Sequence, residues 1–414
     1  YRGTEYIGKR GVEVSYQQSL HGVTGLERVE IEAAGRGIRT LSRTAAHPGR
    51  NVTLTLDIGL QQVAEAAFSG RRGALVALDP ANGAVLAFVS VPAYDPNLFV
   101  DGIDVQSWKA LITSADRPLN NRAIAGLYPP GSTFKPFMAL AALELGKRTR
   151  ESTIQDPGYF AFGGRRFRDS RLGGHGTVDL RKSLVVSSDV YYYQLAHDLG
   201  IVAIAGFMQQ FGFGARTGID LDGEATGVLP SPQWKKQRFR RREQQHWYAG
   251  ETISVGIGQG YNAYTPLQLA AATAALANGG ALYRPHVVSN IDDPRSGARE
   301  TVTPHLIRRV AVKPAHVAFV REAMAGVNSE GTAAGAFADA QYTSAGKTGT
   351  AQVVGIKQNE KYDASKLDER LRDHSLFIAF APMTSPKIAL AVVVENGGFG
   401  SRAAAPIARI VLDY

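Results

Sequence analysis

Strand-like and helix-like hydrophobic patterns alternate along the first part of the chain. Residues 51–56 alternate polar and apolar side chains, as a half-buried strand does. Asp57 then caps a predicted helix that runs to Phe68. The apolar runs 74–78 and 84–89 flank an Asn-Gly turn, and this pattern predicts a β-hairpin.

A second hairpin and a final helix are predicted near the C-terminal end. Residues 376–381 and 388–394 are apolar runs joined by a short turn, residues 351–354 predict a third strand, and residues 403–411 predict a helix packed on the sheet. Residues 132–290 are predicted to be mainly helical, in the segments 134–145, 181–199, 202–211 and 266–278. Strands at both ends with helices between them predict an α+β domain whose terminal strands share one antiparallel sheet.

Residues 1–48 predict a remnant of a separate, extended β-rich domain. The stretch is polar and basic, and it lacks the apolar residues needed for a core of its own. We therefore assign residues 1–48 to one domain and residues 49–414 to a second. The polar stretch 359–374 predicts a solvated loop. Because the chain opens at Tyr1 without a methionine, we expect a preceding segment.

Composition describes a globular protein and narrows the chemistry. The chain has 414 residues, of which 44% are hydrophobic and 20% charged, which is ordinary for a folded protein with an ample core. The absence of cysteine excludes disulfides, thiolate zinc sites and a cysteine nucleophile. No apolar run in the sequence approaches the ~18–20 residues that span a bilayer.

The charge favours anionic surroundings. The net charge is +9 and the pI is about 9.6, and much of the excess lies in residues 235–242. We interpret this basic stretch as a solvated surface loop, with membrane headgroups as the alternative partner. No zinc finger, RNA-recognition sequence or heptad pattern accompanies the charge, so we expect no nucleic-acid partner.

Three short motifs carry the candidate chemistry. Ser132 and Lys135 are three residues apart at the start of a predicted helix, which puts both side chains on one face. A Ser-x-x-Lys pair alone carries little information, because such motifs occur by chance. Further along, the chain supplies Ser187-Ser188-Asp189 and Lys347-Thr348-Gly349. The three motifs together predict an acyl-transfer enzyme with a serine nucleophile.

Each residue of these motifs has a predicted role. A serine hydroxyl needs a base to take its proton, and a buried Lys135 beside a second cation, Lys347, is favoured in its neutral, proton-accepting form. Ser187 can relay that proton to the leaving amine, and Asp189 reaches the same cleft if the turn there is not helical.

The third motif is predicted to border the substrate cleft. Gly349 would leave space for a substrate backbone running antiparallel to the strand, while Thr348 and Thr350 offer hydroxyls to a carboxylate. The N–H groups of Ser132 and Thr350 are the candidate oxyanion hole.

The chain resembles the transpeptidase domain of class B penicillin-binding proteins, and among them the elongation-type penicillin-binding protein 2. The resemblance covers about residues 50–414, and residues 1–48 resemble the end of the N-terminal pedestal domain. The matching segments are 128–136, 187–189, 347–352, 256–261 and 94–97. Aspartate at position 189 and threonine at position 348 are closer to the elongation type than to the division type.

The resemblance implies a D,D-transpeptidase that cross-links peptidoglycan stem peptides through a Ser132 acyl-enzyme and is a target of β-lactams. It also implies a role in cell elongation and shape maintenance. Family members are anchored in the inner membrane by one N-terminal helix, and their catalytic domain faces the periplasm. Their partners include a SEDS-type glycosyltransferase and other elongation-complex proteins.

A second constellation comprises Asp156, Asp169 and His175, in a Gly-rich segment predicted to be irregular. Two carboxylates and an imidazole can hold a zinc ion with one further ligand. The resemblance implies structural zinc here in some elongation-type relatives, which have a cysteine at the position of Ser188. Serine is a poor zinc ligand, so this chain departs from that pattern.

The alternative to zinc is that these residues serve local structure. Asp156-Pro157-Gly158 is a sequence typical of turns, and Asp169 can pair with Arg166 or Arg168.

Three other functions fit the same motifs. A serine β-lactamase of the same fold needs a base that activates water on the acyl-enzyme, and we find no obvious candidate between Asp189 and Lys347. A D,D-carboxypeptidase differs only in using water as the acceptor. A penicillin-sensing domain would be acylated and would signal without turnover.

Overall fold

The computed structural model describes residues 7–355 and 366–414, which form two compact units. The first unit comprises residues up to 55 together with 219–222 and 286–303, and the second comprises the remainder. The two later segments of the first unit were predicted from the sequence to belong to the second domain. None of the helices in the described residues is long and apolar enough to span a membrane.

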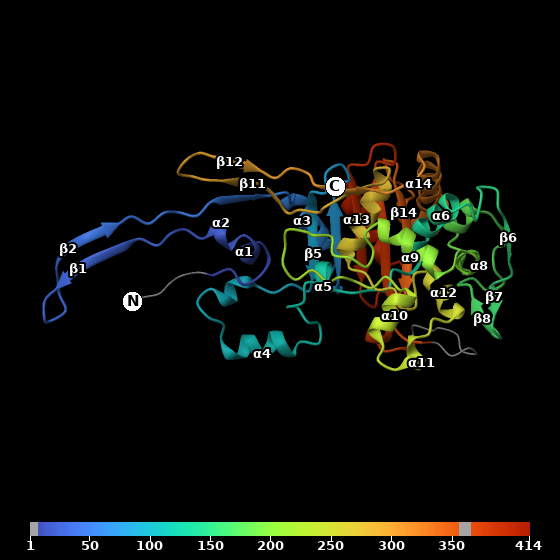
Figure 1. The fold of residues 1–414 in the computed structure, drawn as a ribbon, viewed down its shortest axis with the longest axis horizontal. Helices are drawn as coiled ribbons and strands as arrows, with labels where there is room; N and C mark the ends of the chain where they lie inside the picture. The colour runs from blue at the N-terminus through green and yellow to red at the C-terminus, as the bar shows by residue number, and fades with distance from the viewer. Residues whose placement is uncertain (1–6, 356–365) are drawn as a thin grey trace. The chain divides into compact units, whose positions relative to one another are not determined.

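The first unit is built of short helices and narrow antiparallel sheets (Figure 1). One two-stranded sheet pairs β1 with β2, and a three-stranded sheet has the order β12-β11-β3. Asp220 stabilises this unit, because its carboxylate accepts the N–H groups of Val287 and Val288 at 2.7 and 3.1 Å and the Tyr16 hydroxyl at 2.7 Å. The elements are α1 (Gly11–Ser15), α2 (Gln17–Leu20), β1 (Leu26–Ile31), β2 (Gly37–Thr44), β3 (Asn51–Leu54), β11 (Val288–Asp292) and β12 (Arg299–Thr301).

A five-stranded antiparallel sheet organises the second unit. Its order is β14-β15-β16-β4-β5, so strands from the two ends of the chain lie side by side, as the sequence predicted. The predicted strand at residues 51–56 is instead the edge strand β3 of the first unit's three-stranded sheet. The strands are β4 (Gly73–Leu78), β5 (Val85–Val91), β14 (Ala345–Ala351), β15 (His374–Ala381) and β16 (Ile388–Val394).

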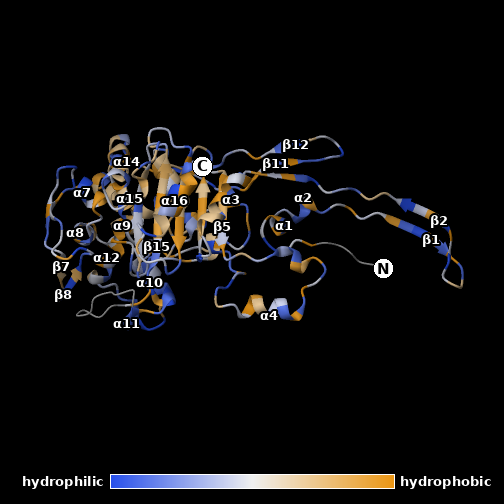
Figure 2. Cartoon of the chain, turned by 180° about the vertical axis from the view of Figure 1, so that it is seen from behind, coloured by the Kyte–Doolittle hydropathy of each residue, from blue (hydrophilic) through white to orange (hydrophobic). Residues whose placement is uncertain are grey.

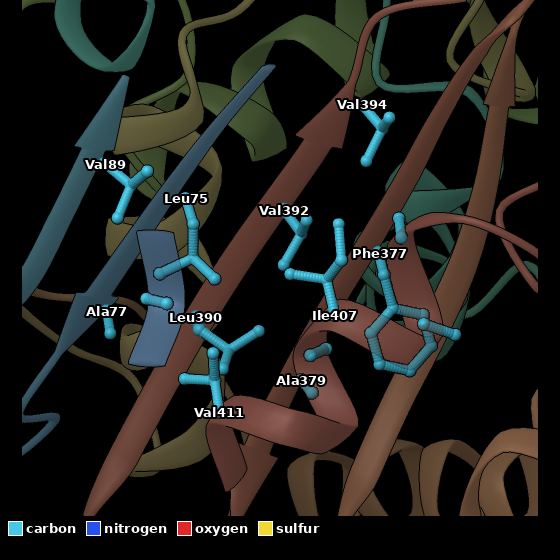
Figure 3. Packing of buried hydrophobic residues seen from close by; sticks show 14 of the residues in the cluster. Leu75, Ala77, Val89, Phe377, Ala379, Leu390, Val392, Val394, Ile407 and Val411 are labelled. Atoms are coloured by element: carbon cyan, nitrogen blue, oxygen red, sulfur yellow. The ribbon is translucent and has the colours of Figure 1, made fainter. Parts of the chain in front are cut away.

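Both faces of this sheet are buried. Leu75 and Ala77 of β4 belong to a core cluster with α3 and α16, and Figure 3 shows Ile407 and Val411 of α16 lying over the strands. Alternate residues of β4 point to the other face, where α13 contacts β4 and β16. Figure 2 shows hydrophobic residues concentrated in these strands and helices. Each large aliphatic side chain buried here stabilises the fold by about 1.5–3 kcal/mol.

Along the chain, most helices of this unit lie between strands β5 and β14. The predicted helices at 134–145, 202–211 and 266–278 are confirmed as α6, α9 and α13, whereas the predicted helix 181–199 is wrong because α7 and α8 are separate. The helices of this unit are α3 (Ile58–Ala67), α4 (Val105–Thr113), α5 (Arg122–Ala125), α6 (Lys135–Glu144), α7 (Leu180–Val185), α8 (Asp189–Leu199), α9 (Ile201–Gln210), α10 (Pro232–Arg238), α11 (Arg242–Gln245), α12 (Ala249–Gly256), α13 (Pro266–Ala277), α14 (Pro314–Ser329), α15 (Ala334–Phe337) and α16 (Ala404–Asp413), with 3-10 turns η1 (Pro96–Phe99), η2 (Gly131–Phe134) and η4 (Glu369–Leu371).

The Gly-rich segment between the first two motifs is more regular than predicted. It forms two small antiparallel ladders, β6 (Ile154–Asp156) with β9 (Gly176–Val178) and β7 (Tyr159–Phe162) with β8 (Arg165–Arg168). A last pair joins β10 (Ala281–Tyr283) to β13 (Leu306–Arg309). Of the predicted loop 359–374, residues 359–365 lie outside the described part of the chain, and the 3-10 turn η4 occupies part of the rest.

Candidate active site

Ser132 lies in the 3-10 turn η2, directly before helix α6. Its side chain is half-buried, so a solute can reach it. The turn is held from two sides, since the Gly131 N–H donates to the Gly258 carbonyl at 3.0 Å and Gly131 itself lies against Thr350 of β14. Gly131 has φ +53°, and a Cβ there would lie 2.5 Å from the Thr350 oxygen. We call the 3-10 turn that carries Ser132 the serine turn. Only glycine at position 131 lets this turn approach strand β14 so closely.

Lys135 is the first residue of α6, and its side chain is fully buried. Its Nζ donates to the Ser187 carbonyl at 2.8 Å, to Ser187 Oγ at 3.2 Å and to Asp189 Oδ1 at 2.6 Å. The ammonium also lies 5.4 Å from the centre of the Tyr192 ring. Among the hydrogen bonds of the described residues, none joins Ser132 Oγ to Lys135.

Ser187 is the point at which the three motifs meet. It lies between α7 and α8 with φ +60°, a left-handed conformation that ends the first helix and is unusual for serine. Lys347 Nζ, from β14, lies 2.8 Å from Ser187 Oγ. The Ser187 hydroxyl is therefore placed between two buried lysine amines. As the sequence analysis required, the turn is not helical, and Asp189 reaches the same place.

The two lysines have different electrostatic surroundings. Burial and the nearby charge of Lys135 lower the pKa of Lys347 well below its ordinary value, although Asp189 opposes this. Burial raises the pKa of the Asp189 carboxyl, and the Lys135 ammonium opposes that rise. Because Asp189 pairs directly with Lys135, Lys347 is the lysine whose neutral form the site favours.

The remaining residues of the third motif lie on strand β14, beside the serine turn. The Thr348 hydroxyl lies 2.7 Å from the Thr332 hydroxyl and is largely buried. A Cβ on Gly349 would lie 2.7 Å from Thr133 Cγ2, so the serine turn itself requires glycine at this position. The Thr350 carbonyl accepts a 2.9 Å hydrogen bond from Gln259 Nε2.

A buried ionic network supports the segment ahead of Ser132. Glu395, just after β16, accepts hydrogen bonds from Arg122 Nε at 2.9 Å and from the Tyr128 hydroxyl at 2.7 Å. The Tyr128 ring meets the His374 ring edge to face, with 5.5 Å between centroids. His374 pairs with Ala351 across β14 and β15. The network thus connects the approach to Ser132 with the strand that carries Lys347.

The structure also brings together Asp156, Asp169 and His175. One ligand atom from each lies within 4.8 Å of the others. Asp156 accepts hydrogen bonds from the Ser188 hydroxyl at 2.7 Å and from the Gly158 N–H at 2.8 Å, so it also serves the predicted turn. Both ring nitrogens of His175 are buried and make no hydrogen bond in the described part of the chain, although Nε2 lies 3.5 Å from Asp169 Oδ1. Such an imidazole is costly to bury unless it binds something.

The Asp169 carboxylate faces the second motif. Its Oδ2 accepts the Asp189 N–H at 2.6 Å and the Val190 N–H at 3.3 Å, and its Oδ1 accepts the Arg171 N–H at 3.0 Å. Asp169 therefore binds directly to the first turn of α8, two residues after Ser187, and Asp156 binds the N-cap residue Ser188.

Several residues that shape this site were not predicted from the sequence. Gly258 packs on Gly131, Gln259 binds Thr350, Thr332 binds Thr348 and Glu395 binds Tyr128. The cluster of glycines in 256–260 was the available signal for the first two. Nothing in the local sequence marks Thr332 or Glu395, because their partners are distant along the chain.

Comparison with known proteins gives one consistent family. The model of the penicillin-binding protein transpeptidase domain matches residues 73–413, and the model of the penicillin-binding protein dimerisation domain matches residues 1–54. The chain is 44% identical to peptidoglycan D,D-transpeptidase MrdA of Haemophilus influenzae over 423 residues, covering 100% of this chain and 63% of the relative. The chain thus spans less than two thirds of that curated relative's length.

Solved structures of penicillin-binding proteins have the same fold as this chain. The crystal structure of Pseudomonas aeruginosa PBP2 in complex with WCK 5153 has a TM-score of 0.85 and 42% identity, and covers 100% of this chain and 82% of that one. The complex between PBP2 and MreC from Helicobacter pylori has a TM-score of 0.83 and 32% identity, and covers 98% of this chain and 71% of that one.

Proposed function

The chain belongs to the penicillin-binding protein transpeptidases, and we propose that it is a peptidoglycan D,D-transpeptidase of the elongation type. Its substrates are pentapeptide stems ending in D-Ala-D-Ala, and β-lactams acylate the same serine. The observation that carries this proposal is the meeting of three distant motifs at one hydroxyl, with Lys135 Nζ at 3.2 Å and Lys347 Nζ at 2.8 Å from Ser187 Oγ.

The arrangement suits a serine nucleophile with a lysine base. Ser132 Oγ attacks the penultimate D-alanine carbonyl, and its proton passes to the neutral amine of Lys135. Lys135 becomes neutral when it gives a proton through Ser187 Oγ to Lys347, whose neutral form burial favours. The Ser132–Lys135 contact is expected to form with substrate, since catalytic hydrogen bonds are often incomplete without it.

The acyl-enzyme then forms with loss of the terminal D-alanine. The tetrahedral intermediate places its oxyanion at the N–H groups of Ser132 and Thr350, which the close packing of Gly131 on Thr350 supports. Ser187 returns the proton to the leaving amine. The amine of a second stem attacks the ester, and the resulting peptide bond is the cross-link.

The cellular setting follows from the family. We assign the protein to the inner membrane, with this part of the chain in the periplasm and an anchoring helix preceding it. A SEDS-type glycosyltransferase and other elongation-complex proteins are its partners. The PBP2–MreC complex of Helicobacter pylori, which covers 98% of this chain, supports assembly with such proteins.

We also propose a structural zinc ion. Asp156, Asp169 and His175 would hold it, and Ser188 or a water molecule would complete the set. The ring nitrogens of His175 support this assignment, because both are buried and make no hydrogen bond in the described residues, and Nε2 lies 3.5 Å from Asp169 Oδ1. The ion would pin the β6–β9 ladder behind the first turn of α8 and contribute to folding, without taking part in the acyl transfer.

Product analysis with purified protein and pentapeptide stems tests the proposed activity. The transpeptidase releases D-alanine and forms cross-linked stems in equal amounts. D-alanine release without cross-links would instead indicate a carboxypeptidase. Rapid turnover of penicillin would indicate a β-lactamase, and acylation without peptide turnover would indicate a sensor.

A further inference from the structure

The basic stretch at residues 235–242 is not an irregular loop, because it includes the end of helix α10 and the start of α11. Helix α10 begins at Pro232 and is capped by Ser231, whose hydroxyl accepts the Trp234 N–H at 3.0 Å. Lys235 is buried, and its Nζ donates to Glu251 Oε1 at 2.5 Å. The same ammonium lies 5.7, 5.3 and 5.6 Å from the ring centres of Trp247, Tyr248 and Tyr261. Lys235 therefore packs inside the protein, and its positive charge is balanced by the Glu251 carboxylate.

The other cations of this stretch have no acidic partner in the described part of the chain. Five of them, which we call the basic surface, are exposed: Lys236, Arg238, Arg240, Arg241 and Arg242. Within residues 7–355 and 366–414, no ion pair involves any of the five, although Glu243 follows Arg242 directly in the sequence.

This lack of acidic partners sets the basic surface apart from many other arginines of the chain. Elsewhere, exposed or half-exposed arginines are matched by nearby carboxylates, in the pairs Arg39–Glu30, Arg299–Asp292, Arg370–Asp116 and Arg409–Asp413. Unmatched like charges held close together repel one another and attract anions. A rigid support that holds five of them in place favours an anionic ligand.

The aromatic residues that support the basic surface are connected to the active site. Trp234 and Phe239 lie 5.1 and 6.0 Å from the Tyr261 ring, measured between centroids. Two residues before Tyr261, Gln259 Nε2 donates to the Thr350 carbonyl at 2.9 Å. Residues 259–261 therefore connect the two regions, because Tyr261 packs against the stretch that carries the basic surface and Gln259 binds Thr350 of β14, the residue proposed for the oxyanion hole.

We propose that the basic surface binds the free carboxylates of a peptidoglycan stem peptide while that stem reacts at Ser132. This inference rests on the proposed transpeptidase function and names how its substrate is recognised. Stem peptides are acidic, and arginine guanidinium groups bind carboxylates with two parallel hydrogen bonds. A penicillin is small, so we expect it to react at Ser132 without contacting the basic surface.

Two variants test the proposal. The first carries Lys236→Gln, Arg240→Gln, Arg241→Gln and Arg242→Gln, and keeps Arg238, which lies over the Phe239 ring. The control removes the same number of charges at the exposed positions Lys147, Lys387, Arg308 and Arg309 of the same unit. Each is assayed for penicillin acylation and for cross-linking of an acidic stem and of the same stem with its side carboxylates amidated.

The first variant should acylate with penicillin at the unmodified rate. Its KM for the acidic stem should rise about five- to tenfold with little change in kcat, since exposed charge pairs are individually weak. The control variant should keep the unmodified KM. In the unmodified protein, the amidated stem should already show the higher KM, and the first variant should no longer distinguish the two stems.

Other outcomes overturn the inference. Equal KM values for the two stems in the unmodified protein would do so without any variant. An unchanged KM in the first variant, with lost binding to vesicles of anionic phospholipid, would assign the basic surface to a membrane instead. If the unmodified protein forms no cross-links with either stem, the proposed function itself fails, and this inference fails with it.

Discussion

The Tyr128 hydroxyl donates a 2.7 Å hydrogen bond to Oε1 of Glu395 and so ties the chain just ahead of Ser132 to the end of strand β16. Arg122 binds the same carboxylate at 2.9 Å. Burial raises the pKa of Glu395, but the hydrogen bonds from Arg122 and Tyr128 and the Arg122 charge outweigh it, so the pKa lies below its ordinary value. The negative charge of Glu395 is thus part of what holds the serine turn.

This relationship predicts an acid-sensitive contribution to stability. Because the pKa of Glu395 is lower in the folded than in the unfolded protein, its contribution is complete above the ordinary glutamate value of about 4.3 and is lost as pH falls through the folded pKa. Glu395→Gln should lower the free energy of unfolding at pH 7 by about 1.5–3 kcal/mol. Its deficit relative to the unmodified protein should shrink at low pH, as denaturant titrations at several pH values would measure.

Tyr128→Phe is the matched control for Glu395→Gln. It removes one of the hydrogen bonds that lower the pKa of Glu395 but keeps the carboxylate and Arg122, so its stability should keep a reduced acid dependence. A Glu395→Gln deficit that stays constant from pH 7 to pH 3 would contradict this account.

Lys135→Ala should slow acylation by penicillin by about 10²–10⁴-fold, the usual contribution of a general base. The variant loses the amine that lies between Asp189 and Ser187. Lys147→Ala, at an exposed lysine shortly after the same helix, is the control and should react at the unmodified rate. Stopped-flow acylation kinetics measure both, and an unchanged rate in Lys135→Ala would remove Lys135 as the base.

The acylation rate should rise with pH through the titration of Lys347. Its pKa is lowered by burial and by Lys135, so the rise should be centred below the ordinary lysine value of about 10.4. Lys347→Arg keeps a positive charge but cannot accept the relayed proton, so it should react more slowly and lose this rise. A pH profile of Lys347→Arg with the same shape as that of the unmodified protein would show that Lys347 does not titrate in the reaction.

The zinc proposal predicts about one equivalent of zinc in protein prepared without chelator. Chelator should then lower the thermal stability, because a structural ion contributes several kcal/mol to folding. Ser188→Cys should tighten zinc binding, since thiolate is a better ligand than a hydroxyl that now donates to Asp156. His175→Gln should abolish the metal content. Less than about a tenth of an equivalent, with no response to chelator, would leave Asp156 and Asp169 as turn and helix-capping residues only.

The sequence was sufficient for the parts of the fold and site that local patterns encode. The hairpins at β4–β5 and β15–β16 follow from apolar runs and turn residues, and the N-cap of α3 is Asp57 as predicted. The Ser132 and Lys347 motifs are likewise contiguous in sequence. Their convergence on Ser187 required the break between α7 and α8, which the helical pattern of residues 181–199 concealed.

What the sequence could not supply are the contacts between distant segments. Arg122 and Glu395 are 273 residues apart, and neither lies in a motif. The requirement for glycine at position 349 was predicted from the substrate, whereas the structure shows that the neighbouring Thr133 already occupies the space. Residues 235–242 were expected to form a solvated loop, but the structure shows them supported from within the protein. The support comes from Lys235, whose burial depends on Glu251 and three aromatic rings.

The identity of the acylated residue tests the central claim most directly. After reaction with a labelled penicillin, the protein should gain the mass of one penicillin, and peptide mapping should place it on Ser132. Ser132→Ala should gain none, while Ser187→Ala should be labelled at Ser132 at a slower rate because the relay between the lysines is lost. Label on any other serine, or continued labelling of Ser132→Ala, would contradict the account.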